Sequence, residues 1–173
     1  MRLETARLVL DPLTPDDAPA LAAIAGHPAV APMLMIFPSP CPEDVAASVI
    51  ARSGSRPRDG VRLAIREGGA LRGSVGVGGD VPGAPASLAF FLAPEVQGRG
   101  LGREAATAFV GACFEDGLPA IHADQFEDNA ASGRLLDALG FETAGRVLGR
   151  SAARPGPAPM LRRRIMVEGW ESR

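Results

Sequence analysis

The residues best placed to do chemistry form one short glycine-rich segment near the middle of the chain. Its members are Gln97, Gly98, Arg99, Gly100, Leu101, Gly102 and Arg103. An apolar run over 88–94 precedes the segment and a helical pattern over 104–114 follows it, so the order is strand, turn and helix N-terminus. A helix N-terminus presents free backbone N–H groups and a partial positive charge to an anion, and glycines let that anion approach closely. With Arg99 and Arg103 alongside, the segment predicts a binding site for a diphosphate.

Two better-known phosphate-binding loops do not fit this segment. A P-loop ends in Gly-Lys-Ser or Gly-Lys-Thr, and all 18 basic residues of this chain are arginine. The dinucleotide-binding pattern fits Gly98 and Gly100, but its third glycine position is Arg103, and that pattern belongs to the first strand–helix–strand unit of a chain. The spacing that remains is Gln-x-x-Gly-x-Gly. A turn without a ligand and another kind of nucleotide-binding module are its alternatives.

This spacing resembles the acyl-CoA pyrophosphate loop of the GCN5-related N-acetyltransferase (GNAT) family. A second stretch carries the resemblance further: Asn129 is followed by Ser132 and then by an amphipathic helical pattern that ends at Gly140. Residues 91–100 are similar to the RimJ/RimL-like branch of the family. Together with the strand-like opening at 4–10, the resemblance spans nearly the whole chain.

The resemblance implies an α+β fold, in which a GNAT-like mixed, mostly antiparallel sheet is flanked by helices and a central strand–helix–strand–helix unit binds acyl-CoA. It also implies an activity, the direct transfer of an acetyl group from acetyl-CoA to a primary amine on a small molecule or a protein N-terminus. Acetyl-CoA is then the co-substrate, and no metal ion takes part. The length of 173 residues suits a single domain over 1–173.

The same resemblance assigns roles to individual residues. The strand that ends near Phe91 and Leu92 would pair its backbone with the pantetheine amides, and residues 97–103 would hold the diphosphate. Asn129 would hydrogen-bond the pantetheine arm, and Ser132 would hydrogen-bond the departing sulfur. Each of these two has a structural alternative, because asparagine is a good helix N-cap and a serine in a first helical turn commonly bonds its own backbone.

The general base is harder to find in the sequence. The resemblance implies a glutamate, common in related sequences, where this chain has Ser87, and a tyrosine acid, which this chain lacks. His122, Asp124 and Glu127 are candidate bases; a water molecule that relays the proton, or an acceptor amine of low pKa, would make a strong base unnecessary. His122 and Asp124 share one face of a strand, so His122 is the candidate catalytic residue, with a structural role as its alternative. The missing groups also leave a non-catalytic acyl-CoA-binding protein open.

Composition argues against several classes of protein. The net charge of −2 argues against a general nucleic-acid binder, and no apolar run reaches the roughly 18 residues that a membrane helix needs. The first residues do not have the pattern of a signal peptide, and Cys41 and Cys113 do not make a disulfide framework. We therefore expect a cytoplasmic protein that acts on a small amine or a peptide N-terminus, with a C-terminal hairpin as a candidate homodimer edge.

The elements that must position these residues follow from hydrophobic patterning and turn signals. We expect strands over 7–11, 61–67, 70–78, 86–93, 120–126, 146–152 and 160–167. Helices are expected over 15–26, 42–53, 101–116 and 129–139. We expect the strand over 86–93 to be buried on both faces, after a turn over 79–85.

Two further segments have more than one interpretation. Residues 28–42 form a predicted loop whose apolar part, 33–37, is either a satellite core cluster or a wall of the acceptor pocket. Strand alternation places Arg162 and Arg164 on one face and Arg163 on the other, which indicates a solvated edge strand. Contact with the 3′-phosphate of CoA or with an acidic acceptor is the alternative for these arginines.

Overall fold

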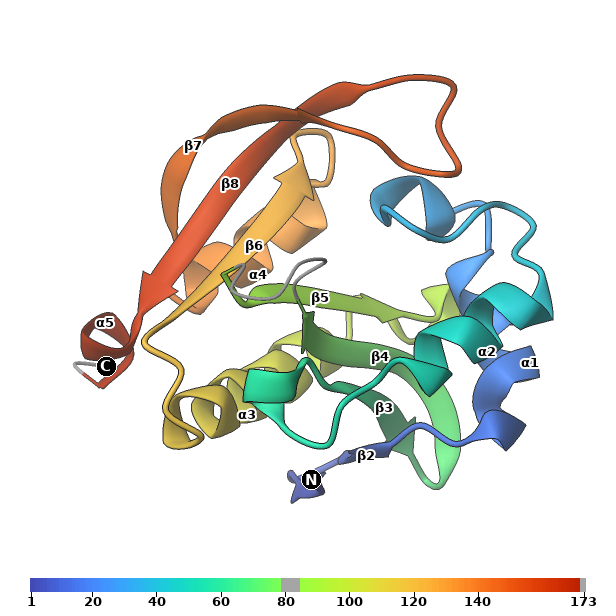
Figure 1. Cartoon of the computed structure of the whole chain (residues 1–173), viewed down its shortest axis with the longest axis horizontal. Coiled ribbons are helices and arrows are strands. Elements are labelled where there is room, and N and C mark those ends of the chain that lie inside the picture. The colour runs from blue at the N-terminus through green and yellow to red at the C-terminus, as the bar shows by residue number, and fades with distance from the viewer. Residues whose placement is uncertain (79–84, 172–173) are drawn as a thin grey trace.

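An eight-stranded sheet forms the centre of the computed structural model, which describes residues 1–78 and 85–171 (Figure 1). The strands are β1 (Leu3–Glu4), β2 (Val9–Pro12), β3 (Arg62–Glu67), β4 (Ala70–Gly78), β5 (Ser87–Leu92), β6 (Ala120–Phe126), β7 (Glu142–Gly149) and β8 (Ala158–Met166). Their spatial order is β1-β2-β3-β4-β5-β6-β8-β7. Neighbouring strands are antiparallel except β5 and β6, which are parallel. The prediction of a mixed, mostly antiparallel sheet is confirmed.

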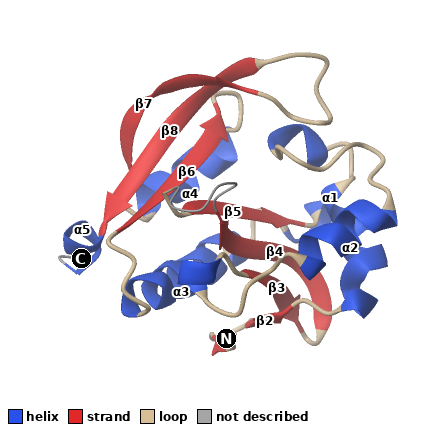
Figure 2. Ribbon diagram, in the orientation of Figure 1, coloured by secondary structure: helices blue, strands red, loops and turns tan. Residues whose placement is uncertain are grey.

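Helices cover both faces of this sheet (Figure 2). The α-helices are α1 (Ala18–Ala25), α2 (Glu43–Ala51), α3 (Leu101–Glu115), α4 (Ala130–Ala138) and α5 (Val167–Glu171), and the short 3₁₀ turns are η1 (Pro15–Asp17), η2 (Ala31–Met33), η3 (Pro57–Asp59) and η4 (Pro94–Val96). One core packs α3 and α4 on the face that carries Leu63 and Ile65. The other core packs α1 and α2 on the opposite face, which carries Ala64 and Phe91. Strand alternation therefore assigns each side chain to one of two layers.

The parallel strands β5 and β6 diverge soon after they meet. Their register contains one pair, Ser87 with His122, and the His122 amide donates to the Ala86 carbonyl at 2.8 Å. β5 goes on pairing with β4 as far as Leu92, while β6 pairs on its other side with β8. In Figure 1 the two strands run apart toward their C-terminal ends. The edge of β5 that faces β6 is therefore left without a strand partner.

The structure corrects three details of the expected elements. β7 begins at Glu142, earlier than expected, because the strand follows directly on the turn after α4. β8 is not an edge strand, since it lies between β6 and β7, and its Arg163 is buried. β5 is not buried on both faces, because α1 and α2 leave Ala89 exposed. Most of the turn expected over 79–85 lies outside the described residues. The sequence did not predict β1, α5 or the turns η2, η3 and η4, and the other elements agree with prediction apart from their ends.

Arg163 fixes the helix that carries Ser132. Its guanidinium donates to the carbonyl oxygen of Phe141 at 2.7 Å and to Oε1 of Gln125 at 3.3 Å, and it forms an ion pair with Asp137. Asp137 lies on α4 and Phe141 just beyond it. One buried charge on β8 thus holds the C-terminal end of α4 against the sheet.

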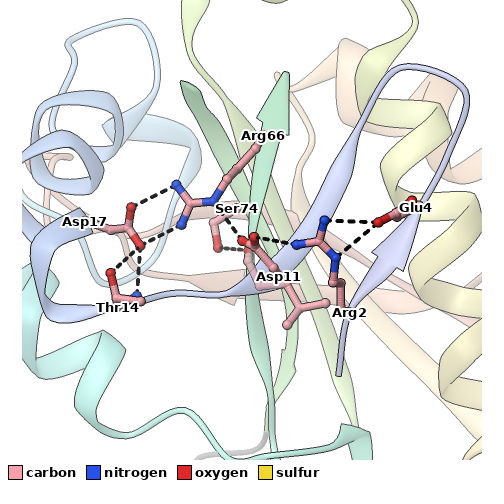
Figure 3. A network of polar contacts seen from close by, with 8 residues as sticks. Arg2, Glu4, Asp11, Thr14, Asp17, Arg66 and Ser74 are labelled. Atoms are coloured by element: carbon pink, nitrogen blue, oxygen red, sulfur yellow. Dashed lines mark hydrogen bonds and ion pairs between the residues drawn. The ribbon is translucent and has the colours of Figure 1, made fainter. Parts of the chain in front are cut away.

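A second arginine network joins the first helical turn to the sheet (Figure 3). Arg66 donates to Asp17 at 3.0 and 2.8 Å and to Asp11 at 2.8 Å, and the Thr14 amide also donates to Asp17. Burial by itself raises the pKa of Asp17, but the hydrogen bonds from Arg66 and Thr14 outweigh it, so the pKa lies below its ordinary 3.8. A lowered carboxyl pKa contributes stability at neutral pH that is lost as the pH falls through that pKa.

We expect Asp17→Asn to lower the free energy of unfolding at pH 7 by about 1–3 kcal/mol, because Arg66 loses a charged acceptor that is shielded from water. Urea unfolding at pH 7 and at about pH 3 measures this, and the difference from wild type should shrink at the lower pH. Asp59→Asn is the matched control, since its pair with Arg56 is exposed and should be worth less than about 1 kcal/mol. Equal losses in the two variants would contradict the role given to the Arg66 network.

Candidate active site

The glycine-rich segment folds as predicted, into a turn between β5 and α3. Gly98 and Gly100 have φ angles of 74° and 79°, in the left-handed region that favours glycine, and Gly100 is the N-cap of α3. In the described part of the chain, the backbone amides of 98–103 donate no hydrogen bond. These free N–H groups and the N-terminus of α3 fit a diphosphate.

Arg7 holds this turn in place, a role that the sequence did not reveal. Its Nη1 donates to the Arg99 carbonyl oxygen at 2.9 Å, and its Nε donates to Glu104 at 2.7 Å. Thr5 donates to the same Glu104 carboxylate at 2.6 Å. Burial by itself raises the pKa of Glu104, but the hydrogen bonds from Thr5 and Arg7 outweigh it and the pKa is lowered. No local pattern signals these contacts, because Arg7 and Glu104 are 97 positions apart.

The two arginines of the turn differ in their surroundings. Arg99 donates to both carboxylate oxygens of Glu67, at 3.0 and 2.7 Å, and these hydrogen bonds lower the pKa of Glu67. Arg103 is exposed at the start of α3, and its guanidinium has no ion pair within the described residues. A diphosphate would therefore meet a free charge at Arg103 and would compete with Glu67 for Arg99. Both contacts stay predictions.

Three members of the segment shape the site through packing or through the backbone. Gln97 donates from Nε2 to the Leu92 carbonyl oxygen at 2.9 Å, which ties the turn to the end of β5. Leu101 is buried in the core on the α3 face. A Cβ atom on Gly102 would lie 3.3 Å from Leu135 and 3.5 Å from Leu92, so glycine lets α3 approach α4 and β5 closely.

Phe91 and Leu92 turn their side chains into the protein. The Phe91 ring packs edge-on against Phe37, with the ring centroids 5.7 Å apart, and Leu92 packs in the opposite core. Only their backbone groups can meet a ligand along the free edge of β5. The predicted role for this strand, backbone pairing with pantetheine, needs only those groups.

The start of α4 has the predicted cap. Asn129 Oδ1 accepts from the Ser132 amide at 3.1 Å, so Asn129 is the N-cap, and its side-chain NH₂ group can still serve a ligand. Ser132 and Leu135 lie one turn apart on the same side of the helix, and Leu135 is the residue beside Gly102. Ser132 therefore lies on the side of α4 that faces the glycine-rich turn.

His122 lies on β6, on the face of the sheet that α1 and α2 partly cover. Asp124 shares that face, as predicted, but it accepts two hydrogen bonds from Arg162 at 3.0 and 2.9 Å. The structure thus pairs Asp124 with Arg162, because β8 brings that arginine directly opposite. Burial lowers the pKa of His122, and the charges of Arg164 and Arg162 lower it further, while Asp124 alone opposes them. His122 is therefore neutral at pH 7, as a general base must be.

Glu127 is poorly placed to act as the base. Its carboxylate accepts from Arg146 at 2.6 and 2.7 Å, and these hydrogen bonds lower its pKa. It lines a shallow depression on the β7–β8 hairpin with Leu148 and Pro159. Its ion pair and low pKa both oppose proton uptake.

Arg154 joins η2 to the loop between β7 and β8. Arg154 donates from Nε to the Pro32 carbonyl oxygen at 2.6 Å and from its two Nη atoms to Asp128 at 2.8 Å. Its guanidinium also lies 4.1 Å from the ring centre of Phe126. The loop between β7 and β8 therefore lies next to η2, as Figure 1 shows at the upper right.

The apolar segment 33–37 divides between its two interpretations. Phe37 is buried in the core that packs α1 and α2, and Leu34 packs against that core. Met35 and Ile36 are exposed by about half, at 50% and 49%. The core interpretation therefore holds for Leu34 and Phe37. A role for Met35 and Ile36 in a wall of the acceptor pocket stays a prediction.

Neither a metal site nor a membrane-spanning helix is found among the described residues. No group of three or more His, Cys, Asp or Glu side chains in residues 1–78 and 85–171 is arranged to hold a metal ion. Within the same residues, no helix has the length and apolar character needed to cross a membrane.

Comparison with known proteins decides the family. The sequence matches the acetyltransferase (GNAT) domain family over residues 7–142. This chain belongs to the GNAT family. It is accordingly an acetyltransferase that uses acetyl-CoA as its acetyl donor. No curated protein matches the chain significantly.

Solved structures agree with this GNAT fold. RimJ of Mycobacterium smegmatis, in complex with CoA-disulfide, is 20% identical over 93% of this chain and 82% of its own, with a TM-score of 0.76. Ribosomal-protein-S5-alanine acetyltransferase from Vibrio fischeri is 16% identical over 98% of each chain, with a TM-score of 0.76. The protein yncA from Salmonella typhimurium, with its cofactor acetyl-CoA, is 20% identical over 94% of this chain and 95% of its own, with a TM-score of 0.74.

We expect Gly100→Val to weaken acetyl-CoA binding by about tenfold or more, because a branched side chain at positive φ distorts the turn and crowds the free amides. Isothermal titration measures the affinity. Gly68→Val is the matched control: Gly68 also has positive φ, at 59°, but lies in the β3–β4 turn with open space around it. A similar loss of affinity in both variants would contradict the role of the loop.

Proposed function

We propose that this GNAT enzyme transfers the acetyl group directly to a primary amine, with the thioester held in the opening between β5 and β6. The observation that carries the proposal is the divergence of these strands beside the free amides of 98–103. The diphosphate of acetyl-CoA would bind at that turn. Its pantetheine arm would run along the free edge of β5, past the backbone of Leu92 and Phe91.

The length of β5 brings the thioester to the point of divergence. From Leu92 back to Ser87 the strand covers about 17 Å, at about 3.3 Å per residue. An extended arm anchored at the turn would therefore end near the pair of Ser87 and His122. Asn129, at the start of α4, would contact the arm through its free NH₂ group.

The residues proposed for proton uptake and for thiolate stabilisation lie on opposite faces of the sheet. His122 lies on the face of α1 and α2, and α4 with Ser132 packs on the face of α3. The amine nitrogen would attack the thioester carbon, and the proton that it loses would pass to His122. The carbon–sulfur bond would then break, and the Ser132 hydroxyl would hydrogen-bond the departing thiolate before it is protonated.

Two kinds of acceptor amine fit this function. A small amine and a protein N-terminus both remain candidates, and the fold relative from Vibrio fischeri, a ribosomal-protein-S5-alanine acetyltransferase, brings alanine-initial peptides into consideration. The cytoplasmic location and the homodimer edge also stay predictions.

An acetyl-CoA thiol-release assay over small amines, amino acids and alanine-initial peptides tests the proposal. We expect turnover with at least one amine, product mass increased by one acetyl group, and sequential kinetics without an acetyl-enzyme intermediate. Tight binding of acetyl-CoA without turnover on any amine would favour a non-catalytic acyl-CoA-binding protein instead.

We expect the pH–rate profile to show an acidic limb with a midpoint below 6.5, because the pKa of His122 is lowered by burial and by two arginines. His122→Gln should remove this limb and reduce kcat by about 10²–10⁴. Arg164→Gln should keep activity and move the limb toward higher pH, because it removes a charge that opposes protonation. If the limb persists in His122→Gln, His122 is not the titrating group. The amine would then lose its proton to water or react in its neutral form.

A further inference from the structure

Arg99 in the glycine-rich turn and Arg72 on β4 share one carboxylate neighbour, Glu67. Arg99 donates to both carboxylate oxygens of Glu67, at 3.0 and 2.7 Å. The Nε atom of Arg72 lies 4.0 Å from Glu67 Oε2, which is too far for a hydrogen bond. Glu67 is the last residue of β3, at the turn that leads into β4. One carboxylate therefore lies within reach of two guanidinium groups and is bonded to one of them.

Arg72 lacks the hydrogen bond that Glu67 could give it. Its Nε is buried and has no hydrogen-bond partner among residues 1–78 and 85–171. Its Nη1 lies 3.8 Å from Glu95, whose carboxylate is mostly exposed. A buried donor without an acceptor is costly. A movement of the Glu67 carboxylate by about 1 Å toward Arg72 would supply the missing acceptor.

This group of charges adjoins the turn that we assign to the diphosphate. Arg99 stands between Gly98 and Gly100, where the backbone amides of the described chain donate no hydrogen bond. The Ala93 amide donates to the Arg72 carbonyl oxygen at 2.8 Å, so Arg72 lies next to the segment that leads into the turn. A diphosphate on the turn would therefore meet the side chain that Glu67 holds.

Arg99 can change partners without any change in the turn. Its carbonyl oxygen accepts from Arg7 Nη1 at 2.9 Å, which fixes the backbone. Its side chain is 47% exposed, and exposed side chains change rotamer readily. An exchange of Glu67 for another anion therefore needs only side-chain rotation.

We propose that Glu67 is a competing anion at the diphosphate site: it holds Arg99 in the free enzyme and passes to Arg72 when the diphosphate of acetyl-CoA binds Arg99. The inference rests on the proposed function and adds a residue that sets the affinity for the co-substrate. Breaking the Glu67–Arg99 pair opposes binding, so acetyl-CoA and CoA both bind less tightly than they would beside an uncharged residue. Weaker binding of CoA favours release of the product.

Glu67→Gln tests this role by isothermal titration. We expect it to tighten the binding of acetyl-CoA and of CoA by about fivefold each, because Arg99 is then free for the diphosphate. The affinity for acetyl-pantetheine, which lacks the diphosphate, should not change. Glu95→Gln is the matched control: Glu95 lies near Arg72 but has no ion pair with Arg99 in the described chain, so acetyl-CoA affinity should change by less than about twofold.

A double variant tests the exchange of partners itself. Arg72→Gln removes the second partner of Glu67 and should weaken acetyl-CoA binding by about threefold. In the Glu67→Gln background the same substitution should have no effect, because no carboxylate is displaced from Arg99. An equal loss in both backgrounds would mean that Arg72 attracts the ligand directly, and it would overturn the exchange. Should Glu67→Gln fail to fold, Glu67→Ala carries the same expectations.

The outcomes distinguish this inference from the site on which it rests. An acetyl-CoA affinity that is unchanged or lowered in Glu67→Gln overturns the role of Glu67, while the diphosphate site stands if Gly100→Val still weakens binding. If neither Gly100→Val nor Glu67→Gln changes the affinity for acetyl-CoA, the assignment of the turn fails together with the inference.

Discussion

The separation of β5 from β6 is the constraint on which the rest of the site depends. A strand that leaves its neighbour exposes peptide groups along one edge, and those groups need another partner. β5 remains bonded to β4 along its whole length, so the exposed edge is rigid. An extended chain with amides, such as pantetheine, can bond to it as a strand would. The glycine-rich turn lies at one end of this edge and the Ser87–His122 pair at the other.

Arginine–carboxylate pairs hold the pieces around that edge. Arg7 fixes the glycine-rich turn, Arg163 fixes α4, and Arg154 fixes the loop between β7 and β8. Each joins segments that are distant in the chain, and the planar guanidinium suits such contacts because it donates in several fixed directions. These arginines have their partners inside the fold, and they stabilise its architecture.

The residues around His122 determine how strong a base it is. Ser87 lies opposite His122, at the strand position where the family resemblance implies a glutamate, and Asp124 is paired with Arg162. His122 is left in a positive field, which makes it a weaker base but keeps it unprotonated at neutral pH.

Local features of this protein were determined by the sequence itself. The turn at 97–103, the Asn129 cap and the helix end at Gly140 depend on residues a few positions apart, so their types and spacing predict them. The family followed from two such motifs in order. The internal position of β8 and the pairing of Asp124 with Arg162 were decided only by the tertiary structure. Strand order decides which side chains face each other across a sheet, and partners that lie dozens of positions apart leave no local pattern to recognise.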